Sequence, residues 1–152
     1  MDEKLVKMKK WASPYKMPPE ILAIPIVESG YQNLKQKPGS KSKSAGIWQW
    51  IPASARRFGL VVDLVKDERL DIPRSTRAAF EYMQANHDRF DGDWLLAVQA
   101  FNSGEANVEK ALFSSGSRDA WELIRWGLPT DRDYLARAVA AMLIVGNREI
   151  LE

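Results

Sequence analysis

A single carboxylate, Glu28, ends an unusually apolar stretch of this 152-residue chain. The residues before it, 21–27, are all aliphatic or proline. In a helix, the face that carries Glu28 also carries Ile21 and Ile24. Such surroundings remove water from a carboxyl group, which raises its pKa and allows it to donate a proton near neutral pH. The alternative is that the helix ends at Glu28 and the carboxylate simply faces water.

Two tryptophans surround a glutamine in the string SAGIWQWIP, residues 44–52. Trp48 and Trp50 flank Gln49, and the nearby Gly46 permits a close approach of backbone. Aromatic faces with an amide between them suit a sugar, which offers apolar C–H faces and hydroxyl edges. The alternative is that both tryptophans anchor the core beside a glycine bend.

An asparagine extends the apolar face of a third stretch, FDGDWLLAVQAFNSGE, residues 90–105. On a helix, Trp94, Val98 and Phe101 share one face, and Asn102 extends this face toward a break at Gly104. An asparagine on a buried side needs hydrogen-bond partners, which a ligand amide or hydroxyl could supply. Asn102 and Gly104 are also suited to capping the end of the helix, and the two roles are compatible.

The elements that must position these residues are predicted to be helices. Apolar residues recur at helical spacing along the chain, and no strand-like alternation of useful length occurs. Residues 32–45 are rich in Gly, Ser and Lys and predict a solvated loop. The fold class is therefore all-α. The expected helices are 2–12, a segment from Pro18 or Pro19 to near Gly30, Pro52 to Gly59, a segment from Pro73 or Ser75 to Phe90, one capped by Asp93, 105–113, 119–126 and one capped by Asp131.

The composition excludes several kinds of site. The 22 basic and 20 acidic side chains give a net charge of +2, which predicts no nucleic-acid partner. The absence of cysteine excludes disulfides, thiol nucleophiles and thiolate metal ligands. His87 is the one histidine, so a His-rich zinc site is excluded, and its polar neighbours predict that it is exposed. No apolar stretch in the sequence approaches the roughly 20 residues of a membrane-spanning helix.

The three stretches, in this order, resemble the catalytic domain of family 1 lytic murein transglycosylases, the soluble-lytic-transglycosylase type. That family has a Glu-Ser pair after an apolar helix, then Gly-Leu-x-Gln, then Ala-Tyr-Asn, then a Tyr that opens a late helix. Here these read as Glu28 and Ser29, GIWQ at 46–49, AFN at 100–102, and Tyr134 in LPTDRDYL. The strings PIVES, AGIWQWIP and FDGDWLLAVQAFNSGE are most similar to the membrane-bound lytic murein transglycosylase D branch.

The resemblance implies a lysozyme-like helical domain of the goose-type lysozyme kind, with a groove for substrate. It covers about 16–147, so the chain is expected to be one catalytic domain. The implied partner is the glycan strand of peptidoglycan, and the implied reaction cleaves the β-1,4 bond between N-acetylmuramic acid and N-acetylglucosamine without water. The product ends are 1,6-anhydro sugars, and Glu28 acts first as acid and then as base.

The resemblance also assigns substrate-binding roles. Ser29 and Gln49 would orient the site or the sugars, and Asn102 would hold the acetamido group or a neighbouring hydroxyl. Trp48, Phe101 and Tyr134 complete the expected binding set, and no metal or organic cofactor is implied. Two departures from the family stand out: Phe101 replaces the family tyrosine, and the spacing from Leu-Pro to Tyr134 is one residue shorter than usual.

Other functions stay open at this stage. One is a lysozyme-type hydrolase, which normally has a second acid, and Glu81, Glu105 and Glu122 are candidates without a distinguishing context. Others are a peptidoglycan-binding module without activity and an all-α protein-interaction domain. The first residues lack the apolar core of a signal peptide. We therefore expect either an excised domain of a periplasmic or cell-envelope enzyme, or a stand-alone relative from a phage or a secretion system.

Overall fold

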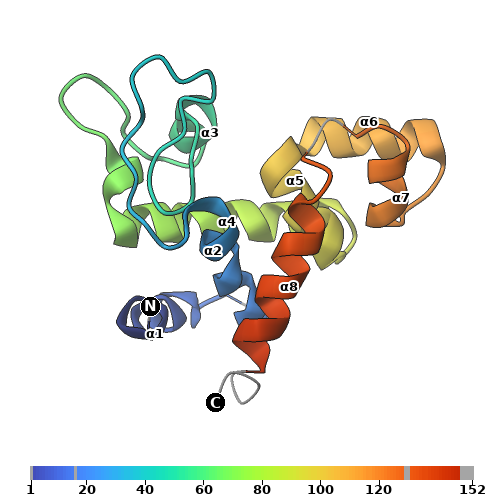
Figure 1. Ribbon diagram of the computed structural model, residues 1–152, viewed down its shortest axis with the longest axis horizontal. Helices are drawn as coiled ribbons and strands as arrows, with labels where there is room; N and C mark the ends of the chain where they lie inside the picture. Colours follow the sequence, from blue (N-terminus) through green and yellow to red (C-terminus); the bar gives the residue numbers. More distant parts are fainter. Residues whose placement is uncertain (1, 16, 129–130, 148–152) are drawn as a thin grey trace. The chain divides into compact units, whose positions relative to one another are not determined.

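The computed structural model describes residues 2–15, 17–128 and 131–147. Within these ranges the regular structure is helical, and β-structure is limited to two isolated bridges. The chain forms two compact units, and each is described by itself. The first comprises Met1–Glu81 and Ala141–Glu152, and the second comprises Tyr82–Ala140. The all-α prediction is confirmed (Figure 1).

The first unit begins with two helical segments that the sequence predicts. Helix α1 spans Asp2–Ala12 and buries Leu5 and Met8. The next segment was expected as a single helix, but it starts as a 3-10 turn, η1 (Pro19–Ala23), and becomes α2 (Ile24–Ser29). Gly30 ends α2 in the left-handed conformation, at φ 60°, which a glycine adopts without steric cost.

The remaining helices of the first unit are α3 (Pro52–Arg57), η2 (Glu68–Leu70) and the first part of α4 (Ile72–Arg89). Proline opens α3 as predicted, because its missing N–H is not needed there. Helix α4 begins slightly before the predicted Pro73 or Ser75. The cause is Asp71, whose Oδ1 accepts the backbone N–H of Arg74 at 3.0 Å and caps the helix.

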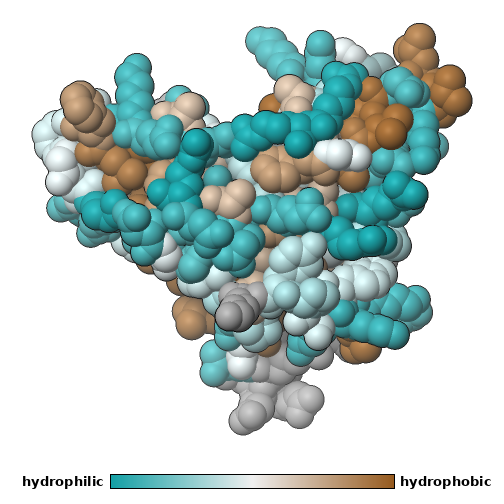
Figure 2. Space-filling model, turned by 180° about the vertical axis from the view of Figure 1, so that it is seen from behind, coloured by the Kyte–Doolittle hydropathy of each residue, from teal (hydrophilic) through white to brown (hydrophobic). Residues whose placement is uncertain are grey.

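The loop between α3 and η2 carries two aliphatic side chains that contribute nothing to the core. Leu64 and Val65 are almost fully exposed at its tip. Figure 2 shows hydrophobic side chains protruding over this loop, at the upper right. Asp63 accepts the backbone N–H groups of Val65 and Lys66, both at 2.8 Å, and this turn brings the chain back toward η2.

The second unit holds α5 (Trp94–Ser103), α6 (Glu105–Ser115), α7 (Ala120–Arg125) and the first half of α8 (Tyr134–Gly146), as far as Ala140. The predicted cap of α5 is confirmed, because Asp93 accepts the N–H of Leu96 at 3.0 Å. Asp119 caps α7 in the same way and accepts the N–H of Trp121 at 2.8 Å. Helix α5 contacts both α6 and α7, and these three helices lie together in Figure 1.

Two expectations for this unit are wrong in detail. The face predicted for α5 was Trp94, Val98 and Phe101, yet only Val98 of these is fully buried. Because α5 packs against more than one helix, its buried residues run consecutively from 96 to 100. His87 was expected to be exposed, but its ring stacks on Trp94 with centroids 4.0 Å apart. The backbone N–H of Gly92 donates to the His87 carbonyl at 2.9 Å, and this tight turn brings the two rings together.

Neither α4 nor any other helix in the described ranges is both long enough and apolar enough to span a bilayer.

Candidate active site

Glu28 occupies the last turn of α2 and is half-buried. Ile21 and Ile24, predicted to share its face, are both buried. The apolar stretch therefore packs into the first unit, and it leaves the carboxyl group at the boundary between core and surface. This position provides the partial loss of water that the sequence predicts for this side chain.

Ser29 joins the helix that carries Glu28 to the GIWQ segment. Its side chain is buried, and its hydroxyl lies 2.8 Å from the carbonyl oxygen of Ile47 and 3.2 Å from that of Pro25. The shorter contact crosses to a segment far along the chain and fixes α2 against it. Ser29 thus contributes to the site by holding backbone in place.

Gln49 lies in a turn formed by residues 43–50. The turn is closed by the backbone N–H of Ala45, which donates to the Trp50 carbonyl at 3.1 Å. Gln49 is half-buried and has a left-handed backbone, at φ 50°, which is uncommon outside glycine. Through the bond between Ser29 and Ile47, the residue after Glu28 is connected to the residue two positions before Gln49.

Trp48 lies in the core, which corrects its expected role as a sugar-binding surface. The residue is 1% exposed, and its ring meets Phe80 edge-on with centroids 5.9 Å apart. Its indole N–H donates to the Thr76 hydroxyl at 2.9 Å, so a buried polar group is satisfied. The neighbouring Trp50 donates to the Ser75 carbonyl in the same way, at 3.2 Å. Both tryptophans anchor the turn on α4, which is the alternative that the sequence left open.

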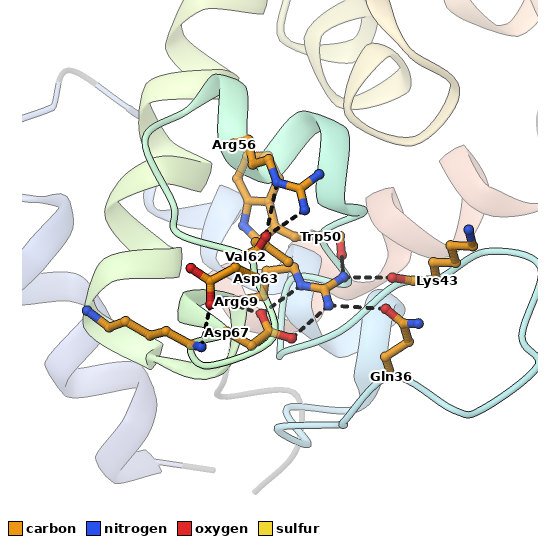
Figure 3. Close-up of polar contacts among 9 residues, drawn as sticks. Gln36, Lys43, Trp50, Arg56, Val62, Asp63, Asp67 and Arg69 are labelled. Atoms are coloured by element: carbon orange, nitrogen blue, oxygen red, sulfur yellow. Dashed lines mark hydrogen bonds and ion pairs between the residues drawn. The ribbon is translucent and has the colours of Figure 1, made fainter.

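The sequence does not predict the buried arginine that holds this turn. Arg69 is 2% exposed, and its guanidinium forms an ion pair with Asp67 at 2.7 Å (Figure 3). The hydrogen bonds from Arg69 hold the pKa of the Asp67 carboxyl below its usual range. The only signal in the sequence is the cluster of charges in KDERLD, which normally indicates a solvated surface.

Gly46 meets the backbone of Arg69 so closely that no side chain fits. A Cβ atom on Gly46 would lie 2.1 Å from the Arg69 carbonyl oxygen, and the φ of Gly46 is 82°. The close backbone approach predicted from the GIWQ segment is therefore confirmed. Its partner is another stretch of this chain, so the glycine serves the packing of the turn.

The second unit contains the remaining predicted residues. Asn102 is exposed in the last turn of α5, so its expected place on a buried side is wrong. The helix ends just after it, where the N–H of Gly104 donates to the Ala100 carbonyl at 2.8 Å. Phe101 is half-buried, and its ring packs at a tilt against Tyr82, with centroids 5.5 Å apart.

Two further side chains near Phe101 carry polar groups. The hydroxyl of Tyr82 donates to Oε2 of Glu105 at 2.7 Å. The sequence offers Glu105 only as one of three undistinguished acids, and it does not indicate Tyr82.

Tyr134 is buried as the first residue of α8, and its N–H donates to the Asp131 carbonyl at 3.0 Å. The predicted opening of a late helix by this tyrosine is confirmed.

In chemical terms, the first unit offers the half-buried carboxyl group of Glu28 and the oriented amide of Gln49. A single carboxyl group can give and recover a proton, and an amide can hold a hydroxyl or an acetamido group. Across the described residues, no group of three or more His, Asp or Glu side chains is arranged to hold a metal ion.

The family model of the transglycosylase SLT domain matches residues 6–124, most of the chain. The chain belongs to the transglycosylase SLT domain family. This SLT domain is 40% identical to the membrane-bound lytic murein transglycosylase D of Escherichia coli K12 over 136 residues, 86% of the chain. It spans 29% of that protein's length. Glu28, Ser29 and Gln49 lie within the matched range, whereas Tyr134 lies beyond it.

Two further similarities extend the comparison. The peptidoglycan transglycosylase gp16 of Escherichia phage T7 is 36% identical over 74 residues, which cover 47% of the chain and 6% of that protein. The crystal structure of the 70 kDa soluble lytic transglycosylase of Escherichia coli superposes with a TM-score of 0.72 at 21% identity. This match covers 89% of the chain and 22% of that protein. The predicted lysozyme-like fold is confirmed.

Proposed function

We propose that this SLT domain is a lytic transglycosylase that cleaves the glycan strands of peptidoglycan without water. The position of Glu28 supports this function most directly. The carboxyl group lies half-buried at the end of α2, and Ser29 ties that helix end to the turn that carries Gln49. One acid and one sugar-orienting amide are thereby held on a common frame.

In the first step, Glu28 acts as a general acid. It donates its proton to the oxygen between N-acetylmuramic acid and N-acetylglucosamine, and the bond from that oxygen to the anomeric carbon breaks. The carbonyl oxygen of the substrate's own acetamido group forms a new bond to the anomeric carbon. Half-burial at the end of α2 keeps this carboxyl group at the boundary of the core, where it can reach the glycosidic oxygen of a bound strand.

In the second step, Glu28 acts as a general base. Its carboxylate takes the proton from the C6 hydroxyl of the same muramic acid, and the C6 oxygen attacks the anomeric carbon. The acetamido group is released and a 1,6-anhydro ring closes. Glu28 has recovered its proton, so the next cycle starts without a second carboxylate.

The other residues bind and orient the strand in this scheme. Gln49 and Asn102 contact hydroxyl or acetamido groups of the sugars, and half-buried Phe101 offers an apolar surface. Ser29, Trp48 and Tyr134 are buried, so we assign them to positioning the groups that touch the substrate. The substrate places the enzyme in the cell envelope of a bacterium, or in a phage that attacks it.

Two rival functions make different products from the same substrate. A muramidase hydrolase adds water and leaves reducing ends, whereas a transglycosylase leaves anhydro ends that are lighter by one water. A binding module without activity associates with the wall and releases nothing. The half-buried carboxyl group of Glu28 favours an enzyme over the module.

The test is to digest purified, labelled sacculi with the wild-type domain and to measure the masses of the released fragments by mass spectrometry. We expect 1,6-anhydro-muramyl ends in nearly all soluble products. A majority of reducing muramyl ends would establish the hydrolase instead. Binding to sacculi without soluble products would establish the module.

A further inference from the structure

Two hydrogen bonds fix the side-chain amide of Gln49 in one orientation. Nε2 lies 2.7 Å from the carbonyl oxygen of Gly46, and Oε1 lies 2.8 Å from the hydroxyl of Ser44. A carbonyl oxygen can only accept, so the NH₂ end of the amide must face Gly46. A hydroxyl can donate, so Ser44 pairs with the oxygen end. The reversed amide would bring its oxygen against the oxygen of Gly46.

The backbone of the turn 43–50 is held at both ends by Arg69 (Figure 3). Nη1 of the guanidinium donates to the carbonyl oxygens of Lys43, at 2.7 Å, and Trp50, at 3.1 Å. Asp67 accepts from Nε and Nη2 at 2.8 and 2.7 Å and sets the plane of the guanidinium. Such a planar fork of donors is specific to arginine, because a lysine ammonium lacks its fixed geometry.

These contacts hold a strained conformation. The left-handed backbone of Gln49, at φ 50°, is disfavoured for a residue with a Cβ atom, and it persists only where surrounding bonds enforce it. The bonds that enforce it are those of Arg69 to Lys43 and Trp50, at either end of the turn.

We propose that Ser44 and Arg69 are positioning residues for glycan binding by Gln49. Arg69 fixes the backbone of the turn and Ser44 fixes the amide, so Gln49 meets the strand already oriented. The second hydrogen of Nε2 has no acceptor in the part of the chain that the structure describes. It is directed to an acceptor on the sugar, either a hydroxyl or an acetamido oxygen. This role rests on the proposed function, in which Gln49 contacts the glycan.

The first test measures the affinity of the Glu28→Gln variant for purified sacculi by co-sedimentation. Adding Ser44→Ala is expected to weaken binding about three- to tenfold, the worth of one hydrogen bond. Adding Ser44→Thr, which keeps a hydroxyl, should restore most of the affinity. The matched control is Ser42→Ala, because among the described residues the Ser42 hydroxyl bonds to those of Ser40 and Ser44 and not to Gln49. An equal loss in the control would overturn the assignment.

A double-mutant cycle separates positioning from general damage. In a background of Gln49→Ala, the change Ser44→Ala should have no further effect on affinity, since no amide remains to be fixed. A full additional loss in that background would contradict the role of Ser44. Arg69→Lys keeps the positive charge but loses the planar arrangement of guanidinium donors. It should weaken binding to sacculi at temperatures where the variant is folded.

Nuclear magnetic resonance of the free protein gives an answer that does not depend on glycan. The chemical shifts of the two Nε2 protons of Gln49 should differ from those of an exposed glutamine. In Ser44→Ala and Arg69→Lys these shifts should move toward the values of an exposed glutamine. If sacculi are not bound at all, the proposed function fails and positioning for a glycan fails with it. If they are bound but these resonances stay unchanged, only the positioning role is overturned.

Discussion

Phe101 stands where the resemblance to the transglycosylase family leads us to expect a tyrosine. The ring is half-buried against Tyr82, whose own hydroxyl already donates to Glu105. We expect Phe101→Tyr to raise kcat/KM on glycan strands by about two- to tenfold, since one added hydrogen bond contributes 0.5–1.5 kcal/mol. The measurement is the rate of release of soluble fragments, with the melting temperature as a control for folding. An unchanged or lower rate in a folded variant would show that this domain does not use the hydroxyl.

At the scale of single residues, the sequence predicts the role of a residue when its neighbours in the chain determine that role. Glu28 after an apolar run, Gly46 before the tryptophans and Asp93 before a helix are all of this kind. Arg69 and Ser44 are not, because their partners come from the folded turn and leave no periodic pattern. Trp48 was ambiguous for a related reason: an aromatic residue suits a core and a sugar equally well.

The turn 43–50 is the element on which the site depends most, and its glycine provides a test. Gly46→Ala should destabilise the fold by more than about 3 kcal/mol, beyond most point substitutions, because the new Cβ would meet backbone at 2.1 Å. The matched control is Gly39→Ala, which has a similar φ of 74° and no atom within 4 Å of the new Cβ. It should cost only about 1–2 kcal/mol of backbone strain.

Urea unfolding of the two glycine variants measures this difference directly. Equal free energies of unfolding would mean that the turn does not contact the backbone of Arg69 as described. A large loss for Gly46→Ala alone would confirm that the turn and η2 pack backbone against backbone.

At the scale of elements, apolar periodicity and capping residues predict the helices well, and two local effects explain the misses. The segment before Glu28 divides into η1 and α2, with Pro19 near the start of the first and Pro25 near the start of the second. Helix α4 begins before its proline because Asp71 caps it. Apolar periodicity also cannot predict which residues of α5 are buried, since that depends on how many other helices pack against α5.

The stability of the whole molecule should depend on pH through a buried carboxylate. Glu68 is 2% exposed, and it meets Lys66 at 2.5 Å and Arg74 at 3.1 Å. The hydrogen bond from Lys66 is the main cause that lowers the pKa of Glu68, followed by the N–H of Val61. Because the pKa is lower in the folded state, the stabilisation is complete above the unfolded value of about 4.5 and is lost as pH falls through the folded pKa.

Glu68→Gln should therefore lower the free energy of unfolding at pH 7, and the deficit should shrink below about pH 4.5. Urea unfolding between neutral and strongly acidic pH measures this. Glu109→Gln, which removes an exposed ion pair with Arg89, is the control and should change stability little at any pH. A deficit for Glu68→Gln that is constant across the range would contradict the ion-pair explanation.

The most direct test of the function of the whole molecule compares two isosteric changes, Glu28→Gln and Glu20→Gln. Both acids are half-buried in the same helical segment of the first unit, but only Glu28 is assigned to proton transfer. With purified sacculi, we predict that Glu20→Gln releases anhydro fragments at close to the wild-type rate, and that Glu28→Gln releases close to none while still binding the sacculi. Wild-type rates of anhydro-product release by folded Glu28→Gln would contradict the central claim.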